Sequence, residues 1–242
     1  MDLLTTATTA DEEARAADVA VLPVGSFEQH GTHLPLATDT IIACAISRSI
    51  GDAYPLLLLP PITISCSHEH VGWAGTTSIS ATTLAAIISD VAASLDDAGI
   101  SKLVLVNGHG GNYVLSNVVQ QANVREPRMA LFPGRHQWEH ARQFAGLTSS
   151  THDDMHAGEI ETSLLLHLDP DLVGPDYRSA DHTTERPDLL VQGVRGYSDS
   201  GVIGRPSLAT SEKGAALLDS LTTSFADTLA ALGAKVGDGR SS

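Results

Sequence analysis

Continuous apolar runs alternate with amphipathic stretches along this chain, and the alternation predicts the order of its elements. Runs rich in Val, Leu and Ile predict buried strands at 18–24 and 55–65, in 101–112 ahead of a glycine loop, and in MALFPG at 129–134. The prolines within 55–65 mark that strand as an edge or a bend. Apolar positions at helical spacing predict helices at 38–53, 80–100, 112–126, 156–170 and 211–235, whereas 171–210 is irregular and polar.

Strands that alternate with helices, and are apolar on both faces, predict an α/β fold with a mainly parallel sheet. Neither a repeat nor a low-complexity linker interrupts the 242 residues, so we expect one domain over 1–242. Parallel sheets bind ligands beyond the carboxyl ends of their strands. The loops GSFEQHG and NGHGGN each follow a predicted strand, so we expect their side chains to meet in one crevice.

The composition of the chain indicates its compartment and excludes some classes of partner. A formal net charge of -15, spread along the chain, argues against nucleic acid or an anionic membrane as a partner. No apolar run approaches the roughly 18 residues of a membrane span, and the acidic N-terminus has no secretory signal. The cysteines Cys44 and Cys66 form no disulfide framework. We therefore expect a cytoplasmic protein with reduced thiols.

The first candidate chemistry is in GSFEQHGTHLPLATD. Glu28 and His30 are two residues apart, so in an extended segment their side chains point the same way. Asp39 lies just before the predicted helix at 38–53, where its carboxylate could bridge two cations. The alternative is a polar loop with Asp39 as a helix N-cap. Carboxylates grouped with histidines favour metal ligation.

His109 lies at the turn of NGHGGN, between a predicted strand and a predicted helix. The glycines permit a tight backbone, but the nucleotide-binding spacings GxGxxG and GxxxxGK[ST] are absent from the sequence. A histidine at such a turn is better placed as a ligand than as a core residue. The backbone N–H groups of Gly110 and Gly111 are candidates for stabilising an oxyanion.

The stretch HDDMHAGEIETSLLLHL adds a carboxylate and a histidine. Glu161 shares a helical stripe with the leucines at 164, 165 and 168, and a buried carboxylate is costly unless it is paired or metal-bound. Glu161 is therefore a candidate ligand and catalytic-site residue, with a buried salt bridge as the alternative. Glu159 lies off the stripe and is a weaker candidate. His156 begins the helix and is free to carry protons.

The stretch SCSHEHVGWAGTTSIS places His70 and Trp73 in a loop. Trp73 either packs there or forms a wall of a small substrate site, as Trp138 could elsewhere. His68 and Glu69 receive no role. Three carboxylates and two histidines suit two divalent ions such as Zn, Mn or Fe. Since GxSxG and HExxH are absent, metal-activated water is the expected nucleophile for hydrolysing an amide or ester.

Five ordered motifs resemble those of the creatininase (creatinine amidohydrolase) family: LPVGSFEQHGTHLPLATD, EHVGWAGTTSIS, VNGHGGN, HAGEIETSLLLHL and GVIGRPSLATSEKGAALL. The resemblance covers about 18–230. It implies a three-layer α/β/α fold, a homo-oligomer with a hexamer favoured, and two metals for C–N bond hydrolysis. It also implies metal ligation by Glu28, His30, Asp39 and His109, with Asp39 bridging, and a proton-shuttling role for His156.

The chain departs from creatininase itself at two positions. Creatininase has Glu two residues after the NGH histidine, where this chain has Gly111, and Thr32 replaces the proline of HGPHLPL. Glu161 is the candidate substitute for the lost ligand. NGHGGN resembles more closely the family's formamide hydrolases and a peptidase of mycofactocin maturation.

We therefore expect a metal-dependent amidohydrolase acting on a small cyclic or linear amide, with substrate contacts from His70, Trp73, Gly110, Gly111 and Trp138. The alternatives are a metallopeptidase that trims a small precursor peptide and a non-catalytic, metal-stabilised binding protein. A long open crevice would favour the peptidase, and a pocket closed by a tryptophan would favour a small cyclic amide.

Overall fold

Four parallel strands form the central sheet in the computed structural model, which describes residues 4–234. They are β1 (Val19–Val24), β2 (Leu57–Leu58), β3 (Lys102–Asn107) and β4 (Met129–Phe132), in the order β2-β1-β3-β4. The register pairs Val24 with Asn107, so the carboxyl ends of β1 and β3 lie side by side. The predicted α/β class with a parallel sheet is confirmed.

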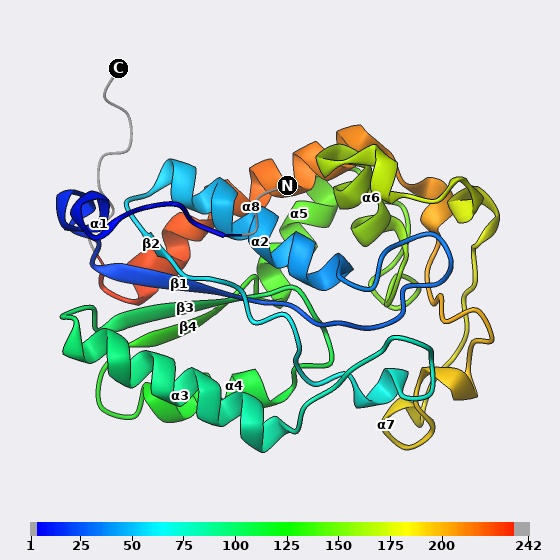
Figure 1. Cartoon of the computed structure of the whole chain (residues 1–242). Helices are drawn as coiled ribbons and strands as arrows, with labels where there is room; N and C mark the ends of the chain where they lie inside the picture. Colours follow the sequence, from blue (N-terminus) through cyan, green and yellow to red (C-terminus); the bar gives the residue numbers. More distant parts are fainter. Residues whose placement is uncertain (1–3, 235–242) are drawn as a thin grey trace.

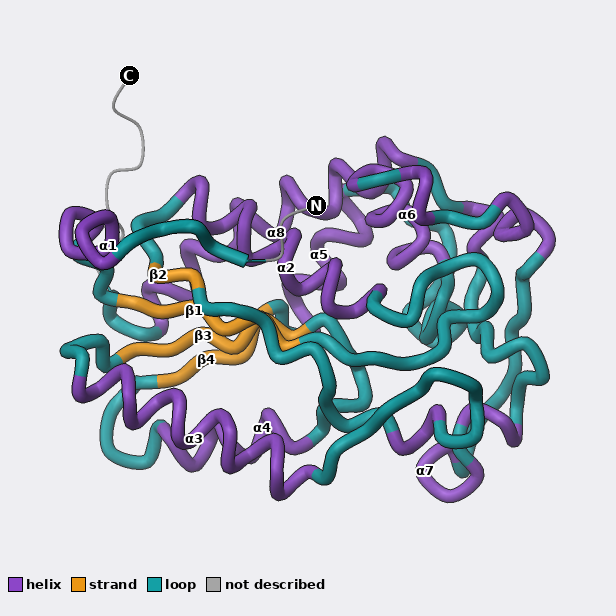
Figure 2. The backbone as a smooth tube through the Cα atoms, viewed as in Figure 1, coloured by secondary structure: helices purple, strands orange, loops and turns teal. Residues whose placement is uncertain are grey.

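Helices cover both faces of the sheet (Figure 1). One layer holds α2 (Thr38–Ala53), α5 (Arg135–Phe144), α6 (Glu159–Leu168) and α8 (Ser211–Ala231), and the other holds α3 (Ala81–Asp97) and α4 (Val114–Ala122). The short α1 (Thr9–Arg15) lies near β2, and α7 (Leu189–Gln192) lies at the opposite end of the molecule. Long loops gather at that end, beyond the carboxyl ends of the strands (Figure 2).

Each face of the sheet has its own apolar cluster, because successive side chains of a strand point to opposite faces. Val19 and Val21 of β1 pack with α2, α6 and α8, whereas Ala20, Leu22 and Val24 pack with α3 and α4. This explains why the strands are apolar at every position, and it confirms the three-layer arrangement. The prediction of one domain over 1–242 stays a prediction.

Most predicted elements are present with shifted ends. The strand expected at 55–65 is only two residues long, although it does lie at the sheet edge as its prolines indicate. The helix expected from 156 begins at Glu159, and the one expected at 112–126 spans Val114–Ala122. Of the closing helix expected at 211–235, position 235 lies outside the described residues. The helices α1 and α5 were not predicted, and α5 has a mainly polar sequence.

Two glycines allow α2 to approach the carboxyl edge of the sheet closely. A Cβ atom on Gly25 would lie 2.3 Å from Thr40 Oγ1, and one on Gly108 would lie 2.3 Å from the carbonyl oxygen of Asp39. Any larger residue at either position would push the first turn of α2 away. The glycines that end β1 and β3 therefore help to place Asp39 between the two strands.

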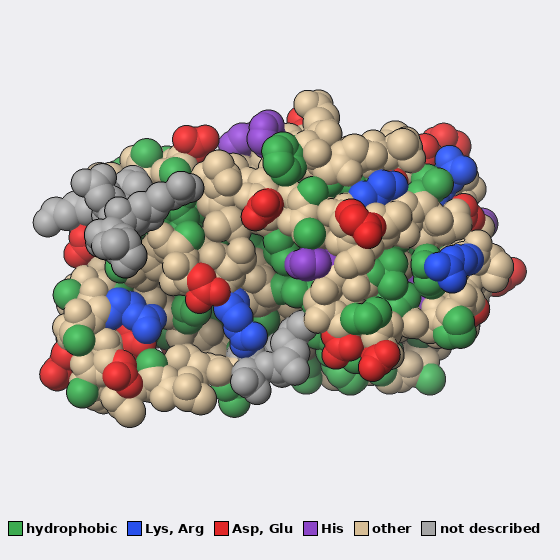
Figure 3. Space-filling model, turned by 90° about the horizontal axis from the view of Figure 1, so that it is seen from above, with side chains coloured by type: hydrophobic (Ala, Val, Ile, Leu, Met, Phe, Trp, Pro, Cys, Tyr) green, Lys and Arg blue, Asp and Glu red, His purple; other side chains and the backbone are tan. Residues whose placement is uncertain are grey.

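The surface matches the spread of charge in the sequence. On the face seen from the α8 side, acidic side chains lie dispersed among basic ones (Figure 3). Within residues 4–234, no helix has the length and apolar content needed to cross a membrane.

Candidate metal centre

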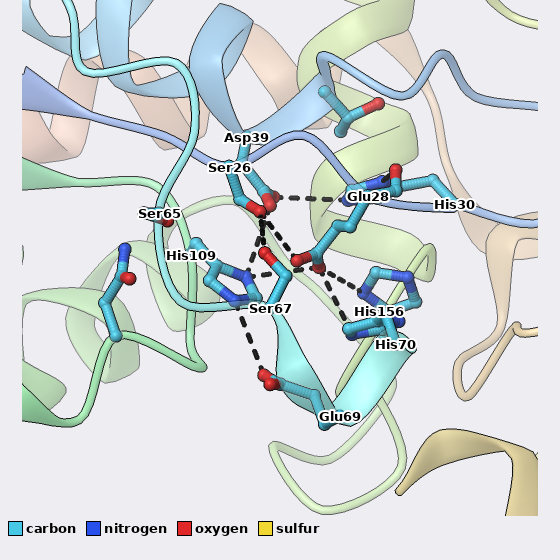
Figure 4. A network of polar contacts seen from close by, with 12 residues as sticks. Ser26, Glu28, His30, Asp39, Ser65, Ser67, Glu69, His70, His109 and His156 are labelled. Atoms are coloured by element: carbon cyan, nitrogen blue, oxygen red, sulfur yellow. Dashed lines mark hydrogen bonds and ion pairs between the residues drawn. The ribbon is translucent and has the colours of Figure 1, made fainter. Parts of the chain in front are cut away.

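Five segments bring ionisable side chains together beyond the carboxyl ends of β1 and β3 (Figure 4). The loop after β1 carries Glu28 and His30, the first turn of α2 carries Asp39, and the loop after β3 carries His109. The segment leading into α6, with the first turn of that helix, adds His156 and Glu161, and the 3-10 turn His68–His70 adds His70. The crevice expected from the two loop sequences is present.

Three groups of three residues have the spacing of metal ligands, and two of them share one aspartate. Glu28, Asp39 and His109 form one group, and His30, Asp39 and Glu161 form the other. His109 Nδ1 lies 3.2 Å from both Glu28 Oε1 and Asp39 Oδ2. His30 Nε2 lies 3.2 Å from Asp39 Oδ1 and 3.9 Å from Glu161 Oε2. All five residues selected from the sequence lie in this cluster, which we call the metal centre.

Hydrogen bonds to backbone carbonyls determine which ring nitrogen of His30 and of His109 lacks a hydrogen and can bind a metal. His30 Nδ1 donates to the carbonyl oxygen of Glu28 (3.0 Å), and His109 Nε2 donates to that of Cys66 (2.9 Å). Carbonyl oxygens only accept, so these nitrogens carry the hydrogens. The remaining nitrogens, His30 Nε2 and His109 Nδ1, face the carboxylates. A histidine held in this way is oriented for metal ligation.

The carboxylates of the metal centre are buried but incompletely paired. Among the described residues, Glu28 Oε1 and Asp39 Oδ2 are buried side-chain atoms with no hydrogen-bond donor. Histidine nitrogens lie 3.2 Å from each, without the alignment of a donor. A buried carboxylate oxygen without a partner is costly, and a divalent cation would offset that cost. The residues present therefore fit a pair of divalent ions.

The electrostatics of the cluster follow from this crowding. Burial lowers the His30 pKa, but the nearby Asp39, Glu161 and Glu28 carboxylates overcome it and raise that pKa to about 9. Burial opposes ionisation of Asp39 as well, yet His30 and His109 hold the Asp39 pKa below its usual range. The metal-free centre thus holds protons that a bound cation must displace.

Asp39 does not have the role of a helix cap. It is the second residue of α2, and the N-cap residue Ala37 makes no side-chain capping bond. Asp39 is 1% exposed, and both of its carboxylate oxygens face histidines. The alternative of a polar loop capped by Asp39 is therefore wrong. Its place in the first turn also favours its negative charge through the helix dipole.

His156 lies against the cluster but differs from the other histidines. Its Nε2 donates to the carbonyl oxygen of Gln29 (2.6 Å), so Nδ1 is the free nitrogen, 3.7 Å from Glu28 Oε1. Burial, together with His70 and His30, lowers the His156 pKa well below its ordinary value. His156 is therefore neutral and able to accept a proton at Nδ1. Its position beside Glu28 and His30 also has the spacing of a ligand.

The two glutamates near the start of α6 have different surroundings. Glu159 is fully buried, and it accepts from Lys213 Nζ at 2.5 Å and from the Ser149 N–H at 2.9 Å. Glu161 instead faces His30 and accepts from the Ala157 N–H at 2.5 Å. Burial raises the Glu161 pKa to about 8. Glu159 makes the buried salt bridge with Lys213, whereas Glu161 faces His30, so the choice between a metal ligand and an ion pair for Glu161 stays a prediction.

Ala157, between His156 and α6, has a strained backbone held from both sides. Its φ is 54°, which is unusual for a residue other than glycine. Its N–H donates to Glu161, and its carbonyl oxygen accepts from His33 Nε2 at 3.1 Å. Backbone strain that is fixed by surrounding contacts is typical of functional sites. His33 thus positions the segment that carries His156.

A cavity of about 580 Å³ opens beside the metal centre. His109, Gly110, Trp138, His156 and Glu161 are among its lining residues. A second cavity, of about 420 Å³, lies beside the same glycine loop and is lined by Glu69, Gly111 and Tyr113 among others. Two of the expected substrate contacts, Gly110 and Trp138, therefore line the first cavity, and Gly111 lines the second.

The other two expected substrate contacts have different surroundings. His70 is 1% exposed, and its Nε2 faces Glu28 Oε1 at 3.2 Å. Trp73 lies beneath the guanidinium of Arg195, whose Cζ is 4.6 Å from the ring centroid. His70 therefore supports a candidate ligand, and Trp73 anchors its loop to the 3-10 turn Val194–Gly196. Their substrate contacts stay predictions.

Sequence reasoning missed two buried residues that organise the centre. Ser26 donates to Glu28 Oε2 at 2.7 Å. Gln29 donates to His70 Nδ1 at 2.8 Å and to the carbonyl oxygen of Gly201 at 3.1 Å. Ser26 could have been found, because it is two residues from Glu28 in an extended segment. Gln29 depends on Gly201, which no local pattern connects to it.

Comparisons with known proteins show the family and agree with the fold. A creatininase family model, described as creatinine amidohydrolase, matches residues 3–229. A mycofactocin precursor peptide peptidase from Mycobacterium ulcerans is 38% identical over 208 residues, covering 80% of this chain and 77% of that protein. A creatinine amidohydrolase from Pseudomonas putida is 27% identical over 244 residues, covering 90% and 92%. The solved structure of a manganese creatininase has a TM-score of 0.78 at 26% identity, covering 93% of this chain and 95% of that one.

Proposed function

We propose, since this chain belongs to the creatininase family of C–N bond hydrolases, that it cleaves a peptide bond of a short precursor peptide with the help of two divalent ions. The observation that carries the metal dependence is the pair of ligand groups sharing Asp39. Peptide cleavage is supported by the relatives named mycofactocin precursor peptide peptidase, which are the more identical ones.

Each ion would have its own ligands. Glu28 and His109 would hold one ion, His30 and Glu161 the other, and Asp39 both. Mixed carboxylate and imidazole ligands suit Zn, Mn or Fe. Two such ions supply an activated water nucleophile and polarise the carbonyl of the scissile amide. Ser26 and His70 hold Glu28, and backbone carbonyls hold His30 and His109, so the ligands need little rearrangement.

His156 would transfer the proton. It is neutral because burial and two neighbouring histidines lower its pKa, and its Nδ1 faces the centre. The free Nδ1 can take a proton from the attacking water and pass it to the leaving nitrogen. The hydrogen bond from Nε2 to the Gln29 carbonyl keeps the ring in the required tautomer throughout. The N–H groups of Gly110 and Gly111 would stabilise the developing oxyanion.

The cavities favour a substrate longer than a single ring. The two cavities, of about 580 and about 420 Å³, both border the loop of His109. Together they could accommodate several residues of a peptide. A small cyclic or linear amide is the second candidate, and the place of Trp138 in the wall of the larger cavity favours it.

A hydrolysis assay tests this proposal. The metal-loaded protein would be incubated with a synthetic mycofactocin precursor peptide, creatinine and a panel of formamides, and products would be identified by mass spectrometry. Glu28→Gln, which removes a charged ligand, is the matched control for contaminating peptidase. Peptide cleavage by the wild type alone supports the proposal. Turnover of creatinine or a formamide but no peptide would favour the second candidate, and metal binding without any hydrolysis would indicate a binding protein.

The proposal extends to the oligomeric state, the compartment and the partners of the protein. We propose a homo-oligomer, with a hexamer favoured by the family resemblance, and action in the cytoplasm. The net charge of -15 disfavours a nucleic-acid or anionic-membrane partner. Sedimentation of the metal-loaded protein would test the hexamer, and a monomer would contradict it.

A further inference from the structure

The space beside Gly111 is occupied by a side chain from another loop. A Cβ atom placed on Gly111 would lie 1.8 Å from Glu69 Oε1 and 2.4 Å from His109 Nε2. Both separations are far shorter than a van der Waals contact, so a side chain at position 111 would force the Glu69 carboxylate and the His109 ring to move. The residue that takes the space of a side chain at 111 is thus Glu69, whereas Glu161 lies at the other end of the metal centre, beside His30.

Glu69 directs its carboxylate at the back of His109 (Figure 4). Its Oε1 lies 3.4 Å from His109 Nε2, the nitrogen that also donates to the Cys66 carbonyl oxygen at 2.9 Å. The opposite nitrogen, Nδ1, is the one that faces Glu28 and Asp39. The Glu69 side chain is only 14% exposed. Burial raises its pKa, but the hydrogen bond and charge of His109 outweigh this and lower it.

The loop that carries Glu69 is held from outside by a segment far along the chain. Gly193 has a φ of +64°, and a Cβ there would lie 2.9 Å from the Glu69 carbonyl oxygen. Arg195 donates to the Gly72 carbonyl oxygen at 2.6 Å and lies over Trp73. These contacts hold the backbone at Glu69 and just after it, and the Glu69 side chain itself is largely buried.

We propose that Glu69 is a positioning residue that acts through His109. Together with the Cys66 carbonyl oxygen, its carboxylate keeps the hydrogen of His109 on Nε2, so that the Nδ1 lone pair points at Glu28 and Asp39. It also makes that nitrogen a more basic ligand, because a negative charge behind an imidazole strengthens its donor atom. Partners of this kind change metal affinity by about 10- to 100-fold. The inference rests on the proposed metal dependence but not on the substrate.

The test measures metal affinity rather than turnover. Metal-free wild type, Glu69→Ala and Glu69→Gln would be titrated with Mn²⁺, with free Mn²⁺ followed by electron paramagnetic resonance. The matched control is Glu126→Gln. It also removes one negative charge, at an exposed residue just before β4. Gly111→Ala would also disturb the contact between Glu69 and His109, because the added methyl group would collide with both. It therefore provides a second test if Glu69→Ala fails to fold. Melting of each metal-free variant separates a general loss of structure from a loss of affinity.

We expect Glu69→Ala to bind Mn²⁺ about 10- to 100-fold more weakly while still binding two ions at saturation. Glu69→Gln keeps an acceptor oxygen but loses the negative charge, so its affinity should lie between those of Glu69→Ala and the wild type. Gly111→Ala should weaken binding, and the control should match the wild type. Unchanged affinity in Glu69→Ala and Gly111→Ala would overturn the proposal. A loss of one ion at saturation would overturn it too, by making Glu69 a ligand. Wild type that binds no Mn²⁺ would instead contradict the proposed function.

Discussion

Two groups of carboxylates, each with one glutamate from the first turn of α6, are satisfied in opposite ways. In the ion-pair network (Arg142, Ser149, Asp154, Glu159 and Lys213), each carboxylate faces donors. Asp154 accepts from Arg142 at 2.8 Å, and Glu159 accepts from Lys213 at 2.5 Å. In the metal centre, Glu28 Oε1 and Asp39 Oδ2 face histidine nitrogens without a donor.

The presence or absence of donors distinguishes the ion-pair network, which is structural, from the metal centre, which is functional. A buried carboxylate with cationic and N–H donors is complete without any ligand. A group in which carboxylate oxygens and imidazole lone pairs point at one another is incomplete until a cation lies between them. Burial alone does not distinguish the two sets, because Glu159 and Glu28 are both 0% exposed.

The largest effect is expected from removing Asp39, the aspartate that both ligand groups share. We expect Asp39→Asn to lose metal and to lower turnover by roughly a thousandfold or more, because each ion contributes several kcal/mol to transition-state stabilisation. Elemental analysis and the hydrolysis assay would measure both. Glu159→Gln is the matched variant from the ion-pair network, and it should keep its metal. Full metal content in Asp39→Asn would remove that residue from the centre.

Removing His156 separates the ligands from the proton carrier. We expect His156→Ala to keep both metals and to lose about 10²- to 10⁴-fold in kcat, the usual contribution of a positioned acid or base. Steady-state kinetics on metal-loaded protein would measure it. A drop in bound metal to one ion would make His156 a ligand, which the spacing also permits. Unchanged kcat would exclude it from the mechanism.

The ion-pair network should respond in stability rather than in metal content. Lys213→Met leaves Glu159 buried without its cation, which typically costs about 3–5 kcal/mol. We expect a lower free energy of unfolding in urea and unchanged metal binding per folded chain. Glu159 is held to Ser149 as well, so a loss well below this range would mean that the serine contacts suffice. Lost metal binding would show that the two sets are coupled.

The smallest expected effect is on the pH dependence of stability. The His30 pKa is raised from 6.5 to about 9, so its contribution is complete below pH 6.5 and is lost as the pH rises through 9. The Glu161 pKa is raised from 4.5 to about 8, so between these pH values the folded state binds a proton that the unfolded state has released. Stability therefore falls as the pH rises over this range. Metal-free protein should therefore melt at a lower temperature at pH 9 than at pH 6.5. Metal-loaded protein should lack this difference, and an equal decline in both forms would contradict the assignment.

Much of the fold could be predicted because its signals are local. Val19–Val24 is apolar at every position, and Ser80 caps α3 through Thr83 as its sequence indicates. The helix α5 was missed because Arg135–Phe144 is mainly polar, and its packing on α8 is a tertiary contact. The strand at 55–65 shrank to Leu57–Leu58, since its pairing with β1 decides its length.

The sequence by itself determined the kinds of ligand in the metal centre and the loops that carry them. Glu28, His30, Asp39 and His109 follow strand ends that a parallel sheet must bring together, and the motifs resemble one family. The tertiary structure decided the rest. The carbonyl oxygen of Cys66 selects the free nitrogen of His109, Lys213 makes Glu159 part of an ion pair, and Glu69 fills the space at Gly111. Each of these depends on a contact between segments far apart in the chain, which no local pattern encodes.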